Sequence, residues 1–509
     1  MVPESEFISI LAALLTGLML SVGIEQFMIP RPPLRRHWAA WALHGGLWLL
    51  AYALIVLLLG RPWFSAAVVS AFLLMLVLVN NAKVNALHEP FVFQDYEYFT
   101  DAIRHPRLYI PFLGWGKFLG SATGFVLAVA IGFWGESTPA QRWMLSGQLG
   151  AIVVIFFLGL LLLLAGRQKK FPVSFDPERD VCALGLLASL WRYAEEERAP
   201  LAAVSPFGFH VPRKSDNDLP HLVAVQSESF FDPRSLYPGI FSGVLAEFDR
   251  LKGDAVAYGK LKVPAWGANT VRTEFAFLSG IGDDKLGVHR FNPYRAIEAA
   301  SDVSSLAAYL KCLGYRTICI HPYPASFYRR NRVYPRLDFD EFLDIRTFDR
   351  TQRYGPYISD AAVTTKIMDV LTKAREPVFI FAITMENHGP LHLERVAPSD
   401  INELYSMPPP PGCDDLTIYL RHMRNADQMV ADLRRGLEQC ERPASLCWYG
   451  DHVPIMPVVY KIFGKPGRDV EYVCWSNQHK MQSRHNNLDA NDLAVHWLRA
   501  IGLIKSDHH

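Results

Sequence analysis

Five long apolar runs in the first third of the chain constrain its fold more than any other feature of the sequence. Each run is poor in charge and close in length to the roughly 20 residues that an α-helix needs to cross the hydrocarbon core of a bilayer. The runs cover residues 7–29, 38–59, 63–79, 118–134 and 145–165. The sequence therefore predicts a transmembrane anchor of five helices over residues 1–167.

The first run lacks the features of a cleavable signal peptide. Acidic Glu4 and Glu6 stand where a signal peptide has basic residues, and Pro30 and Arg31 follow the run in place of a small-residue cleavage site. We expect this helix to remain in the mature protein. Glu25, near its end, could line the helix bundle or extend to the membrane interface, and anchoring at the interface is the simpler interpretation.

The segments outside the five apolar runs are more polar. Residues 80–111 are too polar to span and mix aromatic with charged side chains, so they are predicted to lie along the membrane surface. Residues 168–215 are predicted to form a linker, with an amphipathic helix at 183–197. Residues 216–509 are long enough for one large α/β domain with its own core.

Charge and cysteine content exclude several classes of protein. The net charge is only +1 over 509 residues and both signs are interspersed, so no nucleic-acid partner is expected. The seven cysteines contain no Cys-x-x-Cys pair, which argues against a zinc ribbon or a redox motif. Pairing of Cys312 with Cys319, or of Cys440 with Cys447, stays open, as does the oligomeric state.

Short apolar, β-branched runs alternate with helical patterns in residues 216–509. Strands are predicted at 221–226, 316–321, 378–384 and 445–449, and helices at 303–313, 361–374 and 416–438. This alternation indicates a mostly parallel sheet covered by helices. Polar residues follow each predicted strand directly, and the carboxyl ends of strands are where open α/β sheets bind ligands.

The residues after these strands suggest metal-assisted chemistry. Glu228 follows the first strand and Asp451 and His452 follow the last, a reasonable ligand set for Mn²⁺, Mg²⁺ or Zn²⁺. A hydroxyl near such an ion becomes a nucleophile close to neutral pH. Thr270 and Thr273 are both available, and we favour Thr270 because it begins a predicted helix, where backbone N–H groups bind phosphate.

At this point the whole chain resembles the lipoteichoic acid synthase and phosphoglycerol transferase branch of the alkaline phosphatase and sulfatase superfamily. The matching motifs are Ser-Glu-Ser-Phe (227–230), Asn-Thr-x-x-Thr-Glu-Phe (269–275), Ser-Phe-Tyr-Arg-Arg (326–330), Glu-Asn-His-Gly-Pro (386–390) and Gly-Asp-His (450–452). The resemblance implies an anchor of five helices followed by an α/β sulfatase-like catalytic domain on the extracytoplasmic side of the cytoplasmic membrane.

The resemblance also implies roles for individual residues. One divalent ion, Mn²⁺ before Mg²⁺ or Zn²⁺, would be held by Glu228, Thr270, Asp451 and His452, with Thr270 as nucleophile. Tyr328, Arg330 and His388 would bind the phosphate and glycerol parts of the substrate, and His388 could manage a proton. The family position of Tyr328 is often tryptophan. The Arg330 guanidinium could hold two phosphoryl oxygens in a fork.

The implied reaction moves glycerophosphate from phosphatidylglycerol, through a phospho-threonine, to a glycan or polyglycerolphosphate acceptor, and releases diacylglycerol. Sulfate-ester hydrolysis is not expected, because no Cys/Ser-x-Pro-x-Arg stretch is present for conversion to formylglycine. Two alternatives stay open: phosphoethanolamine transfer by a related family that typically carries additional disulfides, and a non-catalytic binding or sensor protein on the same fold.

Basic residues near the first and fifth runs oppose the implied topology. They are Arg31, Arg35, Arg36, Arg167, Lys169 and Lys170. By the positive-inside rule both clusters should be cytoplasmic, which would put the catalytic domain inside as well. We nevertheless expect the catalytic domain on the extracytoplasmic side, as the resemblance implies, because the anchor and the catalytic motifs both match the family.

Overall fold

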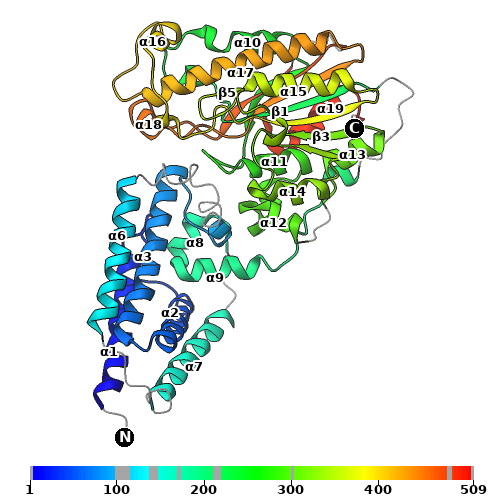
Figure 1. Ribbon diagram of the computed structural model, residues 1–509. Helices are drawn as coiled ribbons and strands as arrows, with labels where there is room; N and C mark the ends of the chain where they lie inside the picture. Colours follow the sequence, from blue (N-terminus) through cyan, green and yellow to red (C-terminus); the bar gives the residue numbers. More distant parts are fainter. Residues whose placement is uncertain are drawn as a thin grey trace. The chain divides into compact units, whose positions relative to one another are not determined.

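The computed structural model describes residues 4–97, 115–136, 147–168, 173–209, 219–299, 303–478 and 484–505. Residues 98–111 of the predicted membrane-surface segment, and 169–172 and 210–215 of the predicted linker, lie outside these ranges. The chain divides into two compact units, residues 1–199 and 200–509. The first holds the apolar helices, and the second holds the sheet (Figure 1).

In the described part of the chain, five helices stand where the sequence predicts spans: α1 (Glu4–Glu25), α2 (Trp38–Leu59), α3 (Pro62–Leu87), α6 (Trp115–Gly135) and α7 (Gly147–Gln168). By length and composition, α1, α2, α3 and α7 can each cross a membrane. Helices α2 and α7 pack closely, because a Cβ at Gly46 would lie 2.8 Å from the Leu163 nitrogen. Such small residues let transmembrane helices approach each other.

Helix α3 extends further than the sequence predicts. Its last turns, from Asn80 to Leu87, are polar, yet their side chains find partners within the unit. The Lys83 ammonium is buried and binds Asp95 at 2.6 Å and Glu89 at 2.7 Å. Asn80 accepts a hydrogen bond from the Phe91 N–H at 2.9 Å. These contacts fold the chain after α3 back onto it, as far as the 3-10 turn η1 (Phe93–Tyr96).

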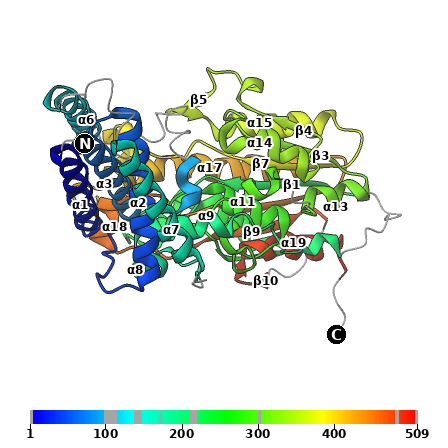
Figure 2. The ribbon, with the colours of Figure 1, turned by 90° about the horizontal axis from the view of Figure 1, so that it is seen from below.

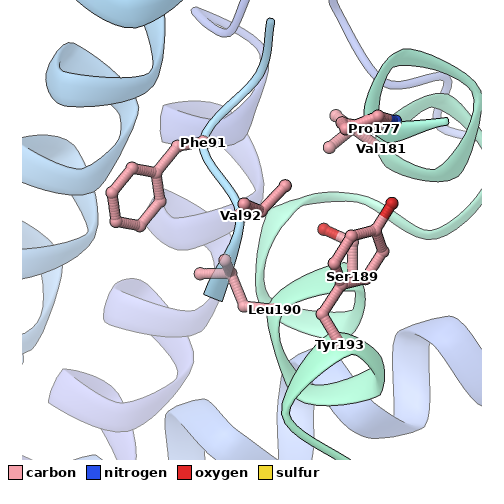
Figure 3. A pocket seen from close by; sticks show the side chains of 7 residues that line it. All are labelled: Phe91, Val92, Pro177, Val181, Ser189, Leu190 and Tyr193. Carbon is pink, nitrogen blue, oxygen red and sulfur yellow. The ribbon is translucent and has the colours of Figure 1, made fainter. Parts of the chain in front are cut away.

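The linker helix predicted at 183–197 corresponds to α9 (Leu186–Glu196), and a further helix, α8 (Pro177–Leu184), precedes it. Gly185 separates them at φ 79°, and a Cβ there would lie 1.6 Å from Arg36 Nη1. Figure 3 shows side chains of both helices across a narrow hollow from Phe91 and Val92.

Glu25 is not the interfacial anchor that the sequence suggests. Its side chain is fully buried and pairs with Arg36 Nη2 at 2.7 Å. It also accepts the Leu186 N–H at 2.8 Å, and therefore joins the end of α1 to the start of α9. A carboxylate at a helix N-terminus is favourable, because backbone N–H groups there have no partner within the helix.

The second unit is built on one sheet with strand order β10-β2-β9-β8-β1-β7-β3-β4, and β11 also pairs with β2. Its central strands are parallel: β8 (Ala444–Gly450), β1 (His221–Ser227), β7 (Val378–Ile383), β3 (Arg316–Ile320) and β4 (Glu341–Leu343). Figure 2 shows β1, β7 and β3 side by side. The four predicted strands are thus confirmed as neighbours in the sheet.

The strands at one edge of the sheet were not predicted from the sequence. Strand β9 (Asp469–Ser476) runs antiparallel to both β8 and β2 (Ala257–Lys262). The short strands β10 (Arg484–His485) and β11 (Leu488–Asp489) complete this edge. A separate hairpin joins β5 (Arg353–Tyr354) to β6 (Tyr357–Ile358).

Helices cover both faces of the sheet (Figure 1). On one face lie α10 (Ala246–Gly253), α15 (Asp360–Lys373) and α17 (Asp414–Glu438); on the other lie α11 (Thr270–Ser279), α13 (Leu306–Leu313) and α19 (Ala490–Ala500). The predicted helices correspond to α13, α15 and α17. The remaining helices are short: α12 (Pro293–Glu298), α14 (Arg330–Val333), α16 (Pro398–Leu404) and α18 (Pro457–Phe463).

All seven cysteines are free thiols in the structure. Neither sequence-neighbour pair, Cys312 with Cys319 or Cys440 with Cys447, is bonded. Instead, Cys447 of β8 faces Cys474 of β9, with the two sulfurs 3.8 Å apart. The sheet register, which pairs residues distant in sequence, decides which thiols are close.

Candidate active site

Three parallel strands bring the candidate residues to one end of the sheet. Glu228 follows β1, Asp451 and His452 follow β8, and His388 lies shortly after β7. The strand ends are tied together, since the Glu228 N–H donates to Thr384 Oγ1 at 2.9 Å. Gly450 must be glycine, because a Cβ there would lie 2.1 Å from the Phe230 carbonyl oxygen. The sheet thus assembles residues that are more than two hundred positions apart.

Glu228, Asp451 and His452 form one buried cluster. Their ligand atoms all lie within 4.8 Å of one another. His452 Nε2 is 3.2 Å from Asp451 Oδ2 and 3.6 Å from Glu228 Oε1. The other ring nitrogen, Nδ1, is 3.1 Å from the Val453 carbonyl, so an N–H there leaves Nε2 free to bind a metal. The cluster offers two carboxylates and one imidazole.

The electrostatics of this cluster fit a divalent cation. Asp451 Oδ2 is buried and accepts no hydrogen bond from the described residues, although His452 Nε2 lies 3.2 Å away, while Asp451 Oδ1 accepts N–H bonds from Ser229 at 2.8 Å and from His452 at 2.9 Å. Burial, followed by the neighbouring Asp451 carboxylate, raises the pKa of Glu228. Two buried carboxylates repel each other unless a cation lies between them. Glu228, Asp451 and His452 would therefore hold such an ion.

We expect Mn²⁺ or Zn²⁺ to stabilise the chain against heat, because an ion that binds only the folded form adds its binding free energy to folding. At a hundredfold excess over Kd the gain is about 2.7 kcal/mol. Thermal melting of the detergent-purified chain with and without a chelator measures it. Asp451→Asn should abolish the shift, whereas an equal shift in that variant would contradict a site at these residues.

The two candidate hydroxyls lie on the first turn of α11. Thr270 is its first residue and follows Asn269, which adopts a left-handed conformation at φ 65°. Thr273 is fully buried, and its hydroxyl donates to the Asp451 carbonyl at 2.7 Å. Residues three apart share a helix face, so Thr270 lies on the same side of the first turn as the residue that bonds to the metal-ligand loop. The hydroxyl of Thr273 is engaged in a structural bond.

Arg330, which the resemblance assigns to phosphate binding, is buried and paired with Glu274 in the structure. Only 1% of its surface is accessible, and two of its three nitrogens, Nε and Nη2, bind the Glu274 carboxylate. Burial lowers the pKa of Arg330, but the charge and hydrogen bonds of Glu274, together with Tyr334 and Tyr294, outweigh burial and leave the pKa above its ordinary value. Nη1 lies 3.3 Å from His321 Nε2. A fork through the Nε edge is therefore already occupied within the protein.

Four residues of this region were not predicted from the sequence: Glu274, His321, Tyr294 and Tyr334. The Glu274 carboxylate accepts hydroxyl bonds from Tyr294 at 2.7 Å and from Tyr334 at 2.8 Å. Glu274 stands in the Asn-Thr-x-x-Thr-Glu-Phe motif, and His321 directly follows β3. Motif membership and strand-end position could have indicated these two; nothing in the sequence marks the tyrosines.

Tyr328 is half-buried, and the Arg330 guanidinium lies 5.2 Å from the centre of its ring. Both Tyr328 and Arg329 have positive φ, at 52° and 53°, and so do Ser229 and Asn269. Left-handed backbone at residues other than glycine costs free energy and is concentrated at functional sites. Four such residues fall within the motifs, which supports the assignment of this region as the site.

His388 is half-buried and lies in a tight loop. Its Nδ1 is 2.6 Å from the Gly389 carbonyl oxygen, and the Tyr357 hydroxyl donates to the same oxygen at 3.2 Å. Burial lowers the pKa of His388, and the charges of Asp451 and Arg330 are close enough to act on it. The lowered pKa favours the neutral form of the ring. The structure brings His388 together with the metal-ligand cluster.

Behind this loop lies a buried polar network centred on His422 of α17. His422 Nδ1 is 3.1 Å from Glu386 Oε1, and Nε2 is 2.8 Å from Glu394 Oε1. Glu386 also accepts the Asp360 N–H at 2.7 Å. Burial lowers the pKa of His422, but the two carboxylates outweigh this and raise the pKa to about 9. The network fixes residues 386–394, which include His388.

This network predicts a pH dependence of stability. A histidine whose pKa is higher when folded stabilises fully below its unfolded pKa and loses that contribution as the pH rises through the folded value. Between about pH 6.5 and pH 9 we expect a loss of about 3 kcal/mol. Melting temperatures across this window measure it, and His422→Gln should flatten the curve. If the melting temperature of that variant depended on pH as in the unmodified chain, the pH dependence would come from groups other than His422.

Comparisons with known proteins identify the family of the second unit. Residues 220–503, more than half of the chain, match the family model for sulfatase, and the chain therefore belongs to the sulfatase family. The superfamily assignment made from the motifs is confirmed. The chain is 27% identical, over 80% of its length and 77% of the relative's, to capsular polysaccharide biosynthesis protein RkpI of Rhizobium meliloti.

The chain is also similar to a second bacterial protein in sequence and to a solved structure in fold. A second protein of that organism, named for cyclic β-1,2-glucan modification, is 24% identical over 80% of this chain and 58% of its own. The solved structure of lipooligosaccharide phosphoethanolamine transferase A from Neisseria meningitidis covers 92% of this chain and 95% of its own, with 14% identity and a TM-score of 0.50. That protein is an integral membrane protein, and the similarity, which is one of fold alone, extends over both units of this chain.

Proposed function

We propose that the chain is a membrane-bound phosphoglycerol transferase that moves glycerophosphate from phosphatidylglycerol to a hydroxyl of a glycan or polyglycerolphosphate acceptor. The observation that carries this proposal is the convergence of Glu228, Asp451 and His452 with the first turn of α11, which begins at Thr270. A buried cation site beside a hydroxyl at a helix N-terminus suits the transfer of an anionic phosphoryl group.

In the first step the Thr270 hydroxyl oxygen bonds to phosphorus as its proton leaves. The bond from phosphorus to the diacylglycerol oxygen breaks, and that oxygen takes a proton. In the second step an acceptor hydroxyl oxygen bonds to phosphorus and loses its proton, the bond from phosphorus to Thr270 Oγ1 breaks, and the Thr270 oxygen takes a proton. A bound divalent ion, Mn²⁺ in our proposal, would supply positive charge to the phosphoryl oxygens and favour the deprotonated hydroxyl.

The remaining residues would bind the transferred group and move protons. His388, whose Nδ1 lies against the Gly389 carbonyl, would hold the glycerophosphoryl group or exchange a proton through Nε2 with an entering or leaving oxygen. Arg330, held by Glu274, would direct Nη1 at a phosphoryl oxygen beside His321. Tyr328 would contact the glycerol part.

The acceptor is proposed to be a polysaccharide or glucan of the cell envelope. The relatives named for capsular polysaccharide biosynthesis and for cyclic glucan modification support a carbohydrate hydroxyl over other acceptors. A polyglycerolphosphate chain would present a chemically equivalent hydroxyl.

We propose that the second unit lies on the extracytoplasmic side of the cytoplasmic membrane. Two of the basic residues that oppose this topology are neutralised: Arg36 pairs with buried Glu25, and Arg167 pairs with Glu195 at 2.6 Å. They therefore count less as free positive charge in the loops. A reporter fused at the C-terminus that is active only in the cytoplasm would overturn this placement.

Phosphoethanolamine transfer is the second candidate, because the fold similarity over 92% of the chain is to such an enzyme. The test is release of diacylglycerol by the detergent-purified chain with Mn²⁺, with a glycan acceptor present, from phosphatidylglycerol and in parallel from phosphatidylethanolamine. Release from phosphatidylglycerol supports our proposal. Release from phosphatidylethanolamine alone favours the second candidate, and no release from either favours a binding or sensor protein.

A further inference from the structure

Four large apolar side chains are exposed around α18, on segments that are distant in sequence. They are Phe241 (41% exposed), Met407 (56%), Val458 (48%) and Ile462 (44%). The uncharged loop Pro408–Pro411, mostly exposed, lies among them. We call these residues and this loop the α18 surface. Val458 and Ile462 are one helical turn apart and share a face of α18.

The α18 surface is continuous because its segments pack on Tyr237. The Tyr237 hydroxyl lies 3.0 Å from the Met407 carbonyl and 2.9 Å from the Pro408 carbonyl, and its ring lies 5.0 Å from the Phe463 ring of α18. The backbone at 239–241 pairs with 404–406. Val458 reaches the end of the proline loop, at Gly412. One apolar surface therefore spans three segments.

This surface adjoins the candidate active site. Helix α18 follows the Asp451-His452 loop, and the Tyr460 hydroxyl donates to the Pro454 carbonyl at 2.6 Å. The Tyr460 ring lies 5.7 Å from that of Trp266, which stands in the segment leading to Thr270. The same helix thus contacts the loop of the metal ligands and the segment of the proposed nucleophile.

The composition of the α18 surface suits a lipid bilayer as its partner. Exposed clusters of apolar side chains mark interaction sites. Lys461 and Lys465 are exposed next to the apolar residues, and lysines beside an apolar face suit anionic lipid headgroups. The chain is itself a membrane protein, so a bilayer is always present at high local concentration.

The proposed donor gives a second reason. The phosphodiester of a phospholipid lies in the headgroup layer, which is only about 5–8 Å thick on each side of the hydrocarbon core. A catalytic site can reach that phosphodiester only if the protein surface beside it touches the bilayer. An apolar surface next to the site would meet the acyl chains that stay behind.

We propose that the α18 surface docks on the bilayer and admits the phospholipid donor to the site. This inference rests on the proposed function in that the donor is a bilayer lipid, whichever headgroup it carries. It assigns Val458, Ile462 and Met407 a lipid contact that is independent of the chemistry of the headgroup.

A contact test that needs no turnover uses the full chain in lipid nanodiscs. A photoreactive benzophenone amino acid placed at position 458 or 407 should form lipid adducts on illumination. The same residue at position 372, exposed on α15, is the matched control and should form none. Absence of lipid adducts at both 458 and 407 would overturn the proposal, and adducts with a second copy of the chain would show a protein interface in its place.

An activity test separates this inference from the proposed function. In Val458→Asp combined with Ile462→Asp, diacylglycerol release from bilayer phosphatidylglycerol should fall about tenfold, since two apolar contacts are replaced by charges that anionic lipid repels. Release from a short-chain, water-soluble phosphatidylglycerol should be unchanged. Lysine at both positions should cost less in an anionic bilayer, and Thr372→Asp should behave like the unmodified chain.

The outcomes are distinct. Equal loss with both donors would show damage to the site itself and overturn the docking role. Full activity of the double aspartate variant on bilayers would overturn it as well. If the unmodified chain releases nothing from either donor, the proposed function fails, while the lipid adducts at positions 458 and 407 still decide the contact.

Discussion

Thr270→Ala should lower the transfer rate by about a thousandfold or more, because removal of a covalent nucleophile leaves only binding and electrostatic stabilisation of the transition state. The first turn of α11 should keep its structure, since Thr273, not Thr270, makes the bond to the Asp451 carbonyl. The measurement is diacylglycerol release with saturating Mn²⁺, together with thermal melting to show that the variant is folded.

Thr273→Ala is the matched control for this prediction. It removes a buried hydroxyl whose hydrogen bond joins α11 to the metal-ligand loop, so we expect lower stability, by about 1–2 kcal/mol, and a smaller loss of activity. Thr273→Ser, which retains the donor, should restore most of both. If Thr270→Ala kept full turnover and Thr273→Ala abolished it, the nucleophile assignment would be wrong.

Glu274→Gln should be the most damaging substitution to the stability of the second unit. Glu274 and Arg330 are both almost completely buried, and loss of the carboxylate leaves the guanidinium charge unpaired. Breaking a buried ion pair in this way costs about 3–5 kcal/mol. The two tyrosine hydroxyls that donate to Glu274 are affected too. Denaturant or thermal unfolding of the purified chain measures the loss.

A double-mutant cycle distinguishes the ion pair from general packing damage. Glu274→Leu combined with Arg330→Met removes both charges, and its cost should be well below the sum of the two single substitutions. The double variant should nevertheless stay inactive, because Arg330 is proposed to contact the phosphoryl group. Additive costs would show that the two side chains do not act as a pair, and an active double variant would exclude Arg330 from substrate binding.

The sequence by itself determined the elements that depend on local pattern. Long apolar runs give helices α1, α2, α3, α6 and α7, and apolar, β-branched runs give β1, β3, β7 and β8, because these patterns are set by residues close together in the chain. It also placed Glu228, Asp451 and His452 at strand ends, and the parallel sheet then brought them together. The roles of Thr270, Tyr328 and His388 in catalysis stay predictions.

Only the tertiary structure decided what depends on partners distant in sequence. Glu25 appeared as an interfacial charge until Arg36 and the start of α9 were placed against it. Arg330 was assigned a fork to two phosphoryl oxygens, but Glu274, fifty-six residues earlier, occupies two of its nitrogens. The antiparallel edge strand β9 escaped interpretation for the same reason. Burial and ion pairing depend on which segments pack together, and a local sequence pattern does not contain that information.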